Sequence, residues 1–173
     1  MKMKWSSILF AFAVLSLSTY SSATTLAKMD FEDMVKAASA CVVAEAMDVT
    51  YTQEQGGMVT LTTFKVMDTA FGDTDKTITV RTAGGMRSNS KIQMTEVVAG
   101  APRFFKNAQS MLLLSEHGNS GHFNIVGVSQ GVFPVANAVV SLPESMGANV
   151  SIDDAISLIN ERRNTDSNSK ISQ

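Results

Sequence analysis

The alternation of apolar and polar residues is clearest between residues 59 and 85. In the segment 59–66, apolar side chains mostly occur at every second position, which is the period of a half-buried β-strand. The alternation shifts by one residue at Thr62–Thr63, and such a shift predicts a β-bulge that bends the strand sharply. After a polar turn, the segment 77–82 alternates again and ends at Gly84–Gly85. A bent strand followed by a partner strand is typical of small sheets that curl and close.

Weaker alternation and shorter apolar runs predict the remaining strands. The continuous apolar run Met111–Leu114 is short enough to be a central strand buried on both faces. The polar segment 86–90 predicts a loop. Besides the two strands above, we expect strands at 41–52, 92–98, 111–114, 122–128 and 132–142.

Two amphipathic helices flank these strands. Asp30 is a suitable N-cap for the first helix, and Ser151 and Asp154 form the capping box of the second. The apolar face of the first helix is formed by Phe31, Met34, Val35 and Ala38. The expected fold is therefore mainly β, a small antiparallel, OB-like closed or partly open barrel with two flanking helices.

The first residues have the pattern of a signal peptide. Lys2 and Lys4 precede an apolar run, and small residues at 21–23 suit cleavage after Ala23. The apolar run is shorter than the roughly 20 residues that a membrane-spanning helix needs. We therefore expect a signal peptide at 1–23, a single β-barrel domain at 24–163 and a disordered tail at 164–173. The mature protein would be exported to the periplasm or the exterior, without stable membrane insertion.

Charge and cysteine content narrow the class of partner. Removing the signal peptide takes away two of the 14 basic residues and none of the 16 acidic ones, so the net charge falls from −2 to −4. A mildly acidic chain is a poor match for nucleic acid.

The single Cys41 cannot form an internal disulfide, and its place in an apolar segment favours a small buried side chain. A Cys41-linked dimer would require an exposed sulfur.

The pentapeptide Gly127–Gly131 matches G-x-S-x-G, the nucleophile elbow of α/β-hydrolases. The elbow requires a helix directly after Ser129, whereas the following residues, Val132–Val135, predict a strand. Both histidines precede Ser129, and in that fold the histidine follows the serine. The match is therefore interpreted as a strand with glycines at a bulge or tight bend.

Glu116, His117 and His122 bracket one turn and raise the question of a metal site. Their spacing matches neither the zincin helix nor a Cys/His zinc framework, so a solvated hairpin tip is favoured. Methionine sulfur suits copper(I), but the methionines are scattered from Met29 to Met146, and core filling explains them better.

The segment Arg103–Lys106 is the candidate for partner binding. Two adjacent aromatic residues, Phe104 and Phe105, cannot both point inward easily from a loop, and an exposed phenylalanine beside cations can anchor a partner. The alternative is that Phe104 or Phe105 closes one end of the barrel.

Several segments resemble a family of exported bacterial proteins of unknown function. The likeness covers roughly residues 30–160 and is carried by S-A-C-V-V-A-E-A, T-I-T-V-R-T-A-G-G, S-M-L-L-L and G-H-F-N-I-V-G-V-S-Q-G. The resemblance implies an OB-like barrel similar in outline to the netrin and metalloprotease-inhibitor module. Those inhibitors chelate zinc through an N-terminal cysteine, whereas the expected mature start here is Thr24–Thr25. The resemblance therefore implies a fold and assigns no functional residue.

Together, these features predict a non-enzymatic binding module of unknown ligand that engages a co-exported protein through barrel-end loops such as 100–107. No catalytic residue, metal ligand or cofactor is expected. Two alternatives stay open, a serine hydrolase that uses Ser129 and a periplasmic copper or zinc binder that uses His117, His122 and methionines. The sequence leaves the oligomeric state open.

Overall fold

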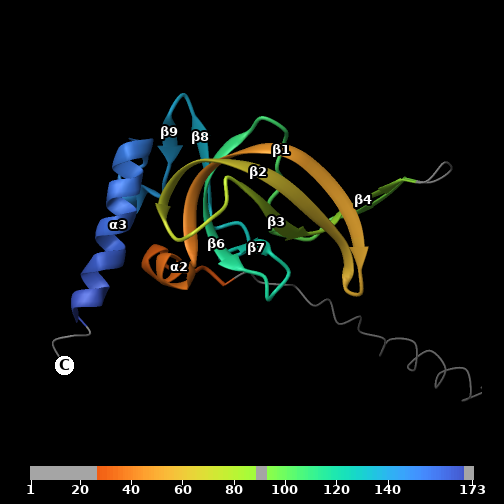
Figure 1. Ribbon diagram of the computed structural model, residues 1–173, viewed down its shortest axis with the longest axis horizontal. Helices are drawn as coiled ribbons and strands as arrows, with labels where there is room; N and C mark the ends of the chain where they lie inside the picture. The colour runs from red at the N-terminus through yellow and green to blue at the C-terminus, as the bar shows by residue number, and fades with distance from the viewer. Residues whose placement is uncertain (1–26, 89–92, 170–173) are drawn as a thin grey trace, which may run out of the picture.

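The computed structural model describes residues 27–88 and 93–169, and this part of the chain is mainly β with two α-helices (Figure 1). The elements in chain order are α2 (Phe31–Ala37), β1 (Ala40–Glu54), β2 (Gly57–Phe71), β3 (Thr77–Ala83), β4 (Gly85–Ser88), β5 (Gln93–Glu96), β6 (Gln109–Glu116), β7 (His122–Ile125), β8 (Val132–Ala136), β9 (Val139–Ser141), the 3-10 helix η1 (Glu144–Met146), β10 (Asn149–Ser151) and α3 (Ile152–Ser169). The predicted mainly β class with two flanking helices is confirmed.

Five strands form a closed ring of pairings in the order β1, β2, β3, β7 and β6, with β6 pairing back to β1. The β3–β7 pair is parallel, and the other pairs of the ring are antiparallel. Strands β8, β9 and β10 continue the sheet from β6. The helices lie to one side of the sheet, and the β4–β5 hairpin extends from the other end (Figure 1). The ring is compatible with the expected barrel-like domain.

The long hairpin of β1 and β2 is curved by residues that have no opposite partner. Strand β2 pairs with β3 without interruption from Val59 to Lys65, so the bulge predicted at Thr62–Thr63 does not lie in β2. On β1, Ala46 pairs with Phe64 and Asp48 pairs with Thr63, so Met47 between them has no partner on β2. The expected bulge is therefore on the partner strand. Its effect on the hairpin is the predicted one, because an unpaired residue increases local bending and twist.

Two hydrophobic cores lie on the two faces of β1 and β6, because successive side chains of a strand point to opposite faces. One core, on the helix side, includes Cys41, Val43, Met111, Leu113, Met34, Val35, Ala155 and Ile159. The other, inside the ring, includes Val42, Ala44, Phe64, Val80, Leu112 and Leu114. The prediction that the run Met111–Leu114 is buried on both faces is confirmed, since all four residues are 0% exposed.

Both helix starts follow the predicted capping pattern. The Asp30 carboxylate accepts a hydrogen bond from the Phe31 N–H at 2.9 Å. The Ser151 hydroxyl accepts from the Asp154 N–H at 3.1 Å and donates to the Asp154 carboxylate at 2.7 Å. An ion pair of 2.7 Å between Arg162 and Glu32 joins α3 to α2. Capping of this kind satisfies backbone groups that a helix end would otherwise leave unpaired.

Several local predictions differ from the structure. The strand expected at 132–142 is divided into β8 and β9 by a turn at Asn137–Ala138. The segment 86–90 was expected to be a loop, but β4 occupies Gly85–Ser88 and pairs with β5. The strand expected at 122–128 ends at Ile125, and a turn follows it. The helix α3 continues past the predicted end at Arg163 to Ser169, because each residue added to a formed helix costs little.

The predicted signal peptide at 1–23 lies outside the described residues and stays a prediction, as does the disordered tail for residues 170–173. Within the described residues, no helix combines the length and the apolar character that crossing a membrane requires.

Cys41 is fully buried, as expected from its apolar segment, and burial raises the pKa of its thiol from 9.0 to about 12. The contribution of Cys41 to stability is therefore complete below pH 9.0 and is lost as the pH rises toward 12. We expect the free energy of unfolding, measured by denaturant titration, to fall over this pH range. The Cys41→Ala variant should show a smaller fall, and an identical pH dependence in the two proteins would contradict the expectation.

Candidate functional site

An apolar groove of about 480 Å³ lies between the β4–β5 hairpin and the loop of residues 101–107. Its lining includes all four residues predicted for partner binding, Arg103, Phe104, Phe105 and Lys106. We call this hollow the apolar groove and the segment 101–107 the groove loop. The structure thus gathers the candidate residues at one concave surface, the kind of surface at which ligands bind.

The groove loop is held against β1 by backbone hydrogen bonds. The Asn107 N–H donates to the Ala46 carbonyl at 2.7 Å, and the Ala46 N–H donates to the Ala108 carbonyl at 2.9 Å. Asn107 has a positive φ of 65°, which reverses the chain at this point. Ala46 is the residue directly before the bulge at Met47. The end of the groove loop is therefore bonded to β1 next to this bulge.

The two adjacent aromatic residues point in different directions. The Phe104 ring packs edge-on against Phe64 of the ring core, with the ring centroids 4.9 Å apart and an interplanar angle of 86°. Phe105 is 73% exposed. The interpretation that a phenylalanine closes one end of the barrel therefore fits Phe104, which packs on the core. The interpretation that a phenylalanine is exposed fits Phe105, which projects into solvent beside the apolar groove.

The other wall of the groove is the β4–β5 hairpin, of which only the second strand was predicted, within the segment 92–98. The Gly84 N–H donates to the Met58 carbonyl at 2.8 Å, and the Thr60 hydroxyl donates to the Gly84 carbonyl at 2.7 Å. The Glu96 carboxylate accepts from the Met58 N–H at 2.8 Å. At Gly85, a Cβ atom would lie 2.9 Å from the Tyr51 ring, so only glycine allows this close approach. These contacts hold the hairpin against the β1–β2 hairpin.

Large apolar side chains are exposed around the groove. Those that line it and are at least one third exposed are Tyr51, Met86, Val97, Val98 and Phe105. Contiguous exposed apolar surface with a polar rim is typical of sites that bind another protein. The apolar groove therefore has the composition of a docking surface.

The rim of the groove carries both charges, with two acidic and two basic residues in its lining. Arg103 and Lys106 are exposed, and among the described residues neither forms a side-chain hydrogen bond or an ion pair. Glu96 is already bound to the Met58 N–H. Asp48 is the remaining acidic residue of the lining.

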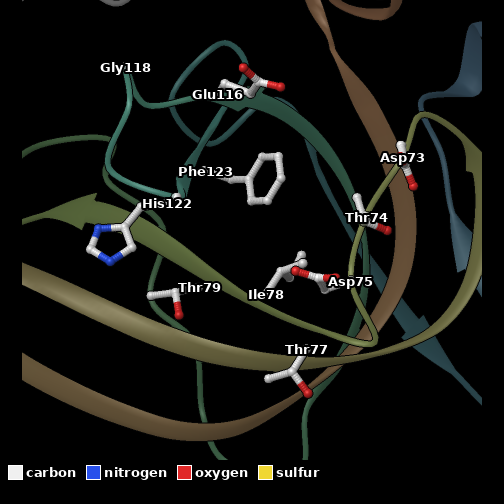
Figure 2. Close-up of a pocket in the computed structure, with 11 residues that line it drawn as sticks. Asp73, Thr74, Asp75, Thr77, Ile78, Thr79, Glu116, Gly118, His122 and Phe123 are labelled. Carbon is white, nitrogen blue, oxygen red and sulfur yellow. The ribbon is translucent and has the colours of Figure 1, made fainter.

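A second hollow, of about 370 Å³, contains the histidine that was considered as a metal ligand (Figure 2). Asp73, Asp75, Glu116 and His122 line it. In Figure 2 the His122 ring and the Glu116 carboxylate lie on different sides of Phe123. Within residues 27–88 and 93–169, no group of three or more His, Cys, Asp or Glu side chains is arranged to hold a metal ion.

His117, the other histidine of this turn, has a polar partner from β7. Its Nδ1 lies 3.0 Å from the Asn124 side-chain nitrogen. The amide nitrogen can only donate, so Nδ1 accepts this hydrogen bond. This contact gives His117 a role in joining the turn to β7.

Ser129 lies in the turn that connects β7 to β8. The Gly131 N–H donates to the Val126 carbonyl at 3.0 Å, and strand β8 follows at Val132. The strand-to-helix corner that defines a nucleophile elbow is therefore not formed. Instead, Gln130 of this turn accepts from the Met29 N–H at 2.9 Å and donates to the Ala27 carbonyl at 3.0 Å, which holds the segment before α2.

The fold and the groove define a mainly β protein with an apolar hollow between one hairpin and one loop. Scans against family models, curated proteins and solved structures found no match for this chain. The site is therefore interpreted from its own residues and geometry.

Proposed function

We propose that this protein is an exported, non-enzymatic binding module that holds an apolar segment of another exported protein in the apolar groove. The observation that carries the proposal is the exposure of Phe105, which is 73% exposed beside a groove of about 480 Å³. An aromatic side chain at the edge of a concave apolar surface is the usual anchor of a protein interface. The signal-peptide pattern at residues 1–23 supports export.

The fold part of the proposal is an OB-like barrel similar in outline to the netrin and metalloprotease-inhibitor module. The closed ring of five strands supports it, because a five-stranded, partly open barrel is the architecture of the OB-fold. Loops at the ends of such barrels carry ligand sites on a rigid scaffold, and the groove loop has this position after the β4–β5 hairpin.

The test uses the mature chain beginning at Thr24, immobilised and exposed to periplasmic extract of the source cell. We expect a partner that is retained by the wild-type chain and retained about tenfold less by Phe105→Ala, since the anchor side chain is removed. A photo-reactive phenylalanine analogue at position 105 should crosslink to the same partner. Mass spectrometry of the crosslinked product then locates the contacting segment.

Met67→Ala is the matched control, because Met67 is 53% exposed on β2 and does not line the groove. This variant should retain the partner as well as the wild type does, and the photo-reactive analogue at position 67 should give no crosslink. Equal retention by Phe105→Ala and the wild type would reject the apolar groove as the binding site.

A further inference from the structure

We propose that four exposed methionines are oxidation sites, at which a peroxide converts the thioether to a sulfoxide while the protein stays folded: Met47, Met67, Met86 and Met94. We call these residues the surface methionines. The inference goes beyond the proposed function and does not depend on it, because it concerns the reaction of side chains with a small oxidant. It is carried by where the fold places the sulfur atoms of the described residues.

The surface methionines differ sharply in exposure from the methionines of the core. Their exposed fractions lie between 39% and 64%, and none of them belongs to either hydrophobic core. In contrast, Met34, Met111 and Met146 pack in the core on the helix side and are at most 7% exposed. An oxidant must reach the sulfur in order to react, so exposure decides which methionines are oxidised.

Two of the surface methionines, Met47 and Met67, occupy bulges in the β1–β2 hairpin. Each is skipped in the register, so no residue of the partner strand lies directly opposite it. The pairing of β1 with β6 ends at Glu45, and the pairing of β2 with β3 ends at Lys65, so both methionines lie beyond the third strand. Such side chains lack the cross-strand neighbour that covers other residues of a sheet. A small oxidant can therefore approach them.

The other two surface methionines lie on the β4–β5 hairpin, which is a sheet of two strands. Met86 of β4 is opposite Thr95 of β5, and Met94 precedes Thr95 in the same strand. Because successive side chains of a strand point to opposite faces, Met86 and Met94 lie on different faces of the hairpin. Met86 lines the apolar groove, and Met94 does not. Each face of the hairpin thus presents one thioether.

The reaction needs only a peroxide besides the methionine. A lone pair of the sulfur attacks one oxygen of hydrogen peroxide, so that an S–O bond forms as the O–O bond breaks. The leaving oxygen takes the proton of the transferred oxygen and departs as water. The sulfur is oxidised to a sulfoxide and the peroxide is reduced. The sulfoxide is polar, which disrupts a core but is tolerated on a surface, and methionine sulfoxide reductases can reverse the change.

Cys41 does not compete for the oxidant. Its side chain is fully buried, and burial raises the pKa of the thiol to about 12. Peroxides attack the thiolate, which such a thiol does not form at neutral pH. The surface methionines are therefore the most accessible sulfur atoms of the described residues, and they can take up oxidant without opening the core.

The experiment treats the folded mature chain with hydrogen peroxide and follows each methionine by peptide mass mapping. We expect the surface methionines to gain one oxygen atom each at least about tenfold faster than Met34, Met111 and Met146, because a core sulfur reacts only after local opening. The half-buried Met29 and Met58 should react at intermediate rates. The circular dichroism spectrum should not change, and methionine sulfoxide reductases A and B should restore the original mass.

The matched control replaces all four surface methionines with leucine, which nearly conserves volume and removes the sulfur. This variant should show no fast uptake of oxygen. Repeating the reaction in urea should abolish the difference between methionines, because unfolding exposes every sulfur. Equal rates for Met94 and Met111 in the folded chain would overturn the inference, as would loss of the folded spectrum when the surface methionines are oxidised. A difference that persists in urea would also overturn it, since the fold would not be its cause.

Discussion

Replacing Phe64 with alanine is expected to lower the free energy of unfolding by about 4 kcal/mol, the usual cost of truncating a buried phenylalanine. Phe64 is 0% exposed in the core of the ring, and its ring is in edge-on contact with Phe104. The substitution removes apolar area from the core and leaves a cavity that the closed ring of strands cannot easily fill. It also removes the surface on which Phe104 rests, so the groove loop should become more mobile in hydrogen-exchange measurements.

Phe105→Ala is the matched control, because it makes the same chemical change on an exposed side chain. Its free energy of unfolding should stay within about 0.5 kcal/mol of the wild type. Urea unfolding of the two variants, with equal slopes, measures the difference directly. Similar losses of stability in both variants would contradict the assignment of Phe105 to the surface.

Gly72→Ala is expected to lower the free energy of unfolding by about 3 kcal/mol, the combined effect of a strained backbone and steric overlap. Gly72 has a φ of +87°, a conformation that residues with a Cβ atom adopt at a cost. A Cβ atom at this position would lie 2.5 Å from the Ser39 carbonyl oxygen and 2.6 Å from the Ala40 Cα. Both are backbone atoms at the start of β1, so the overlap can be relieved only by moving the strand.

Gly118→Ala separates the two causes. Gly118 also has a positive φ, of +53°, but a Cβ atom there would have nothing within 4 Å. This variant should therefore lose only the backbone part, about 1 kcal/mol. Thermal unfolding of both variants gives the comparison, and equal losses would show that the overlap at Gly72 has no energetic effect.

The elements that the sequence predicts well are those whose burial is set by their own pattern. Strand β3 buries Ile78, Val80 and Thr82 on one face, as its alternation indicates. The run Met111–Leu114 is recognised because a strand with two buried faces needs no alternation. The segment 164–169 was expected to lie in a disordered tail, whereas α3 continues there to Ser169 on a polar sequence that a residue-by-residue pattern does not distinguish from a tail.

The β4–β5 hairpin was only half recognised because its position depends on distant residues. Met86–Ser88 are mostly polar or exposed, and their segment has no apolar face of its own to indicate a strand. The contacts that place the hairpin, from Glu96 to Met58 and from Gly85 to Tyr51, join residues more than thirty positions apart. For the same reason, the sequence indicated the groove loop as a candidate site but not the wall opposite it.

The positive φ at Val128 is a second feature that local pattern could not reveal. Val128 has a φ of 65° in the turn after β7, although β-branched residues rarely adopt this conformation. In the sequence, Val126 and Val128 are apolar residues at alternate positions, and this pattern favoured a strand where the structure has a turn. In this turn, Gln130 is hydrogen-bonded to Met29 and Ala27, which lie about one hundred positions earlier in the chain. A local sequence pattern does not indicate such contacts.

The opposite directions of Phe104 and Phe105 have a consequence for how this protein can diverge among related organisms. The inward ring packs against Phe64, so a substitution there is expected to destabilise the fold. The outward ring carries no such folding constraint, so under the proposed function a lineage can exchange it to follow changes in its partner. If the proposed function holds, specificity can therefore change at one position while its immediate neighbour preserves the scaffold.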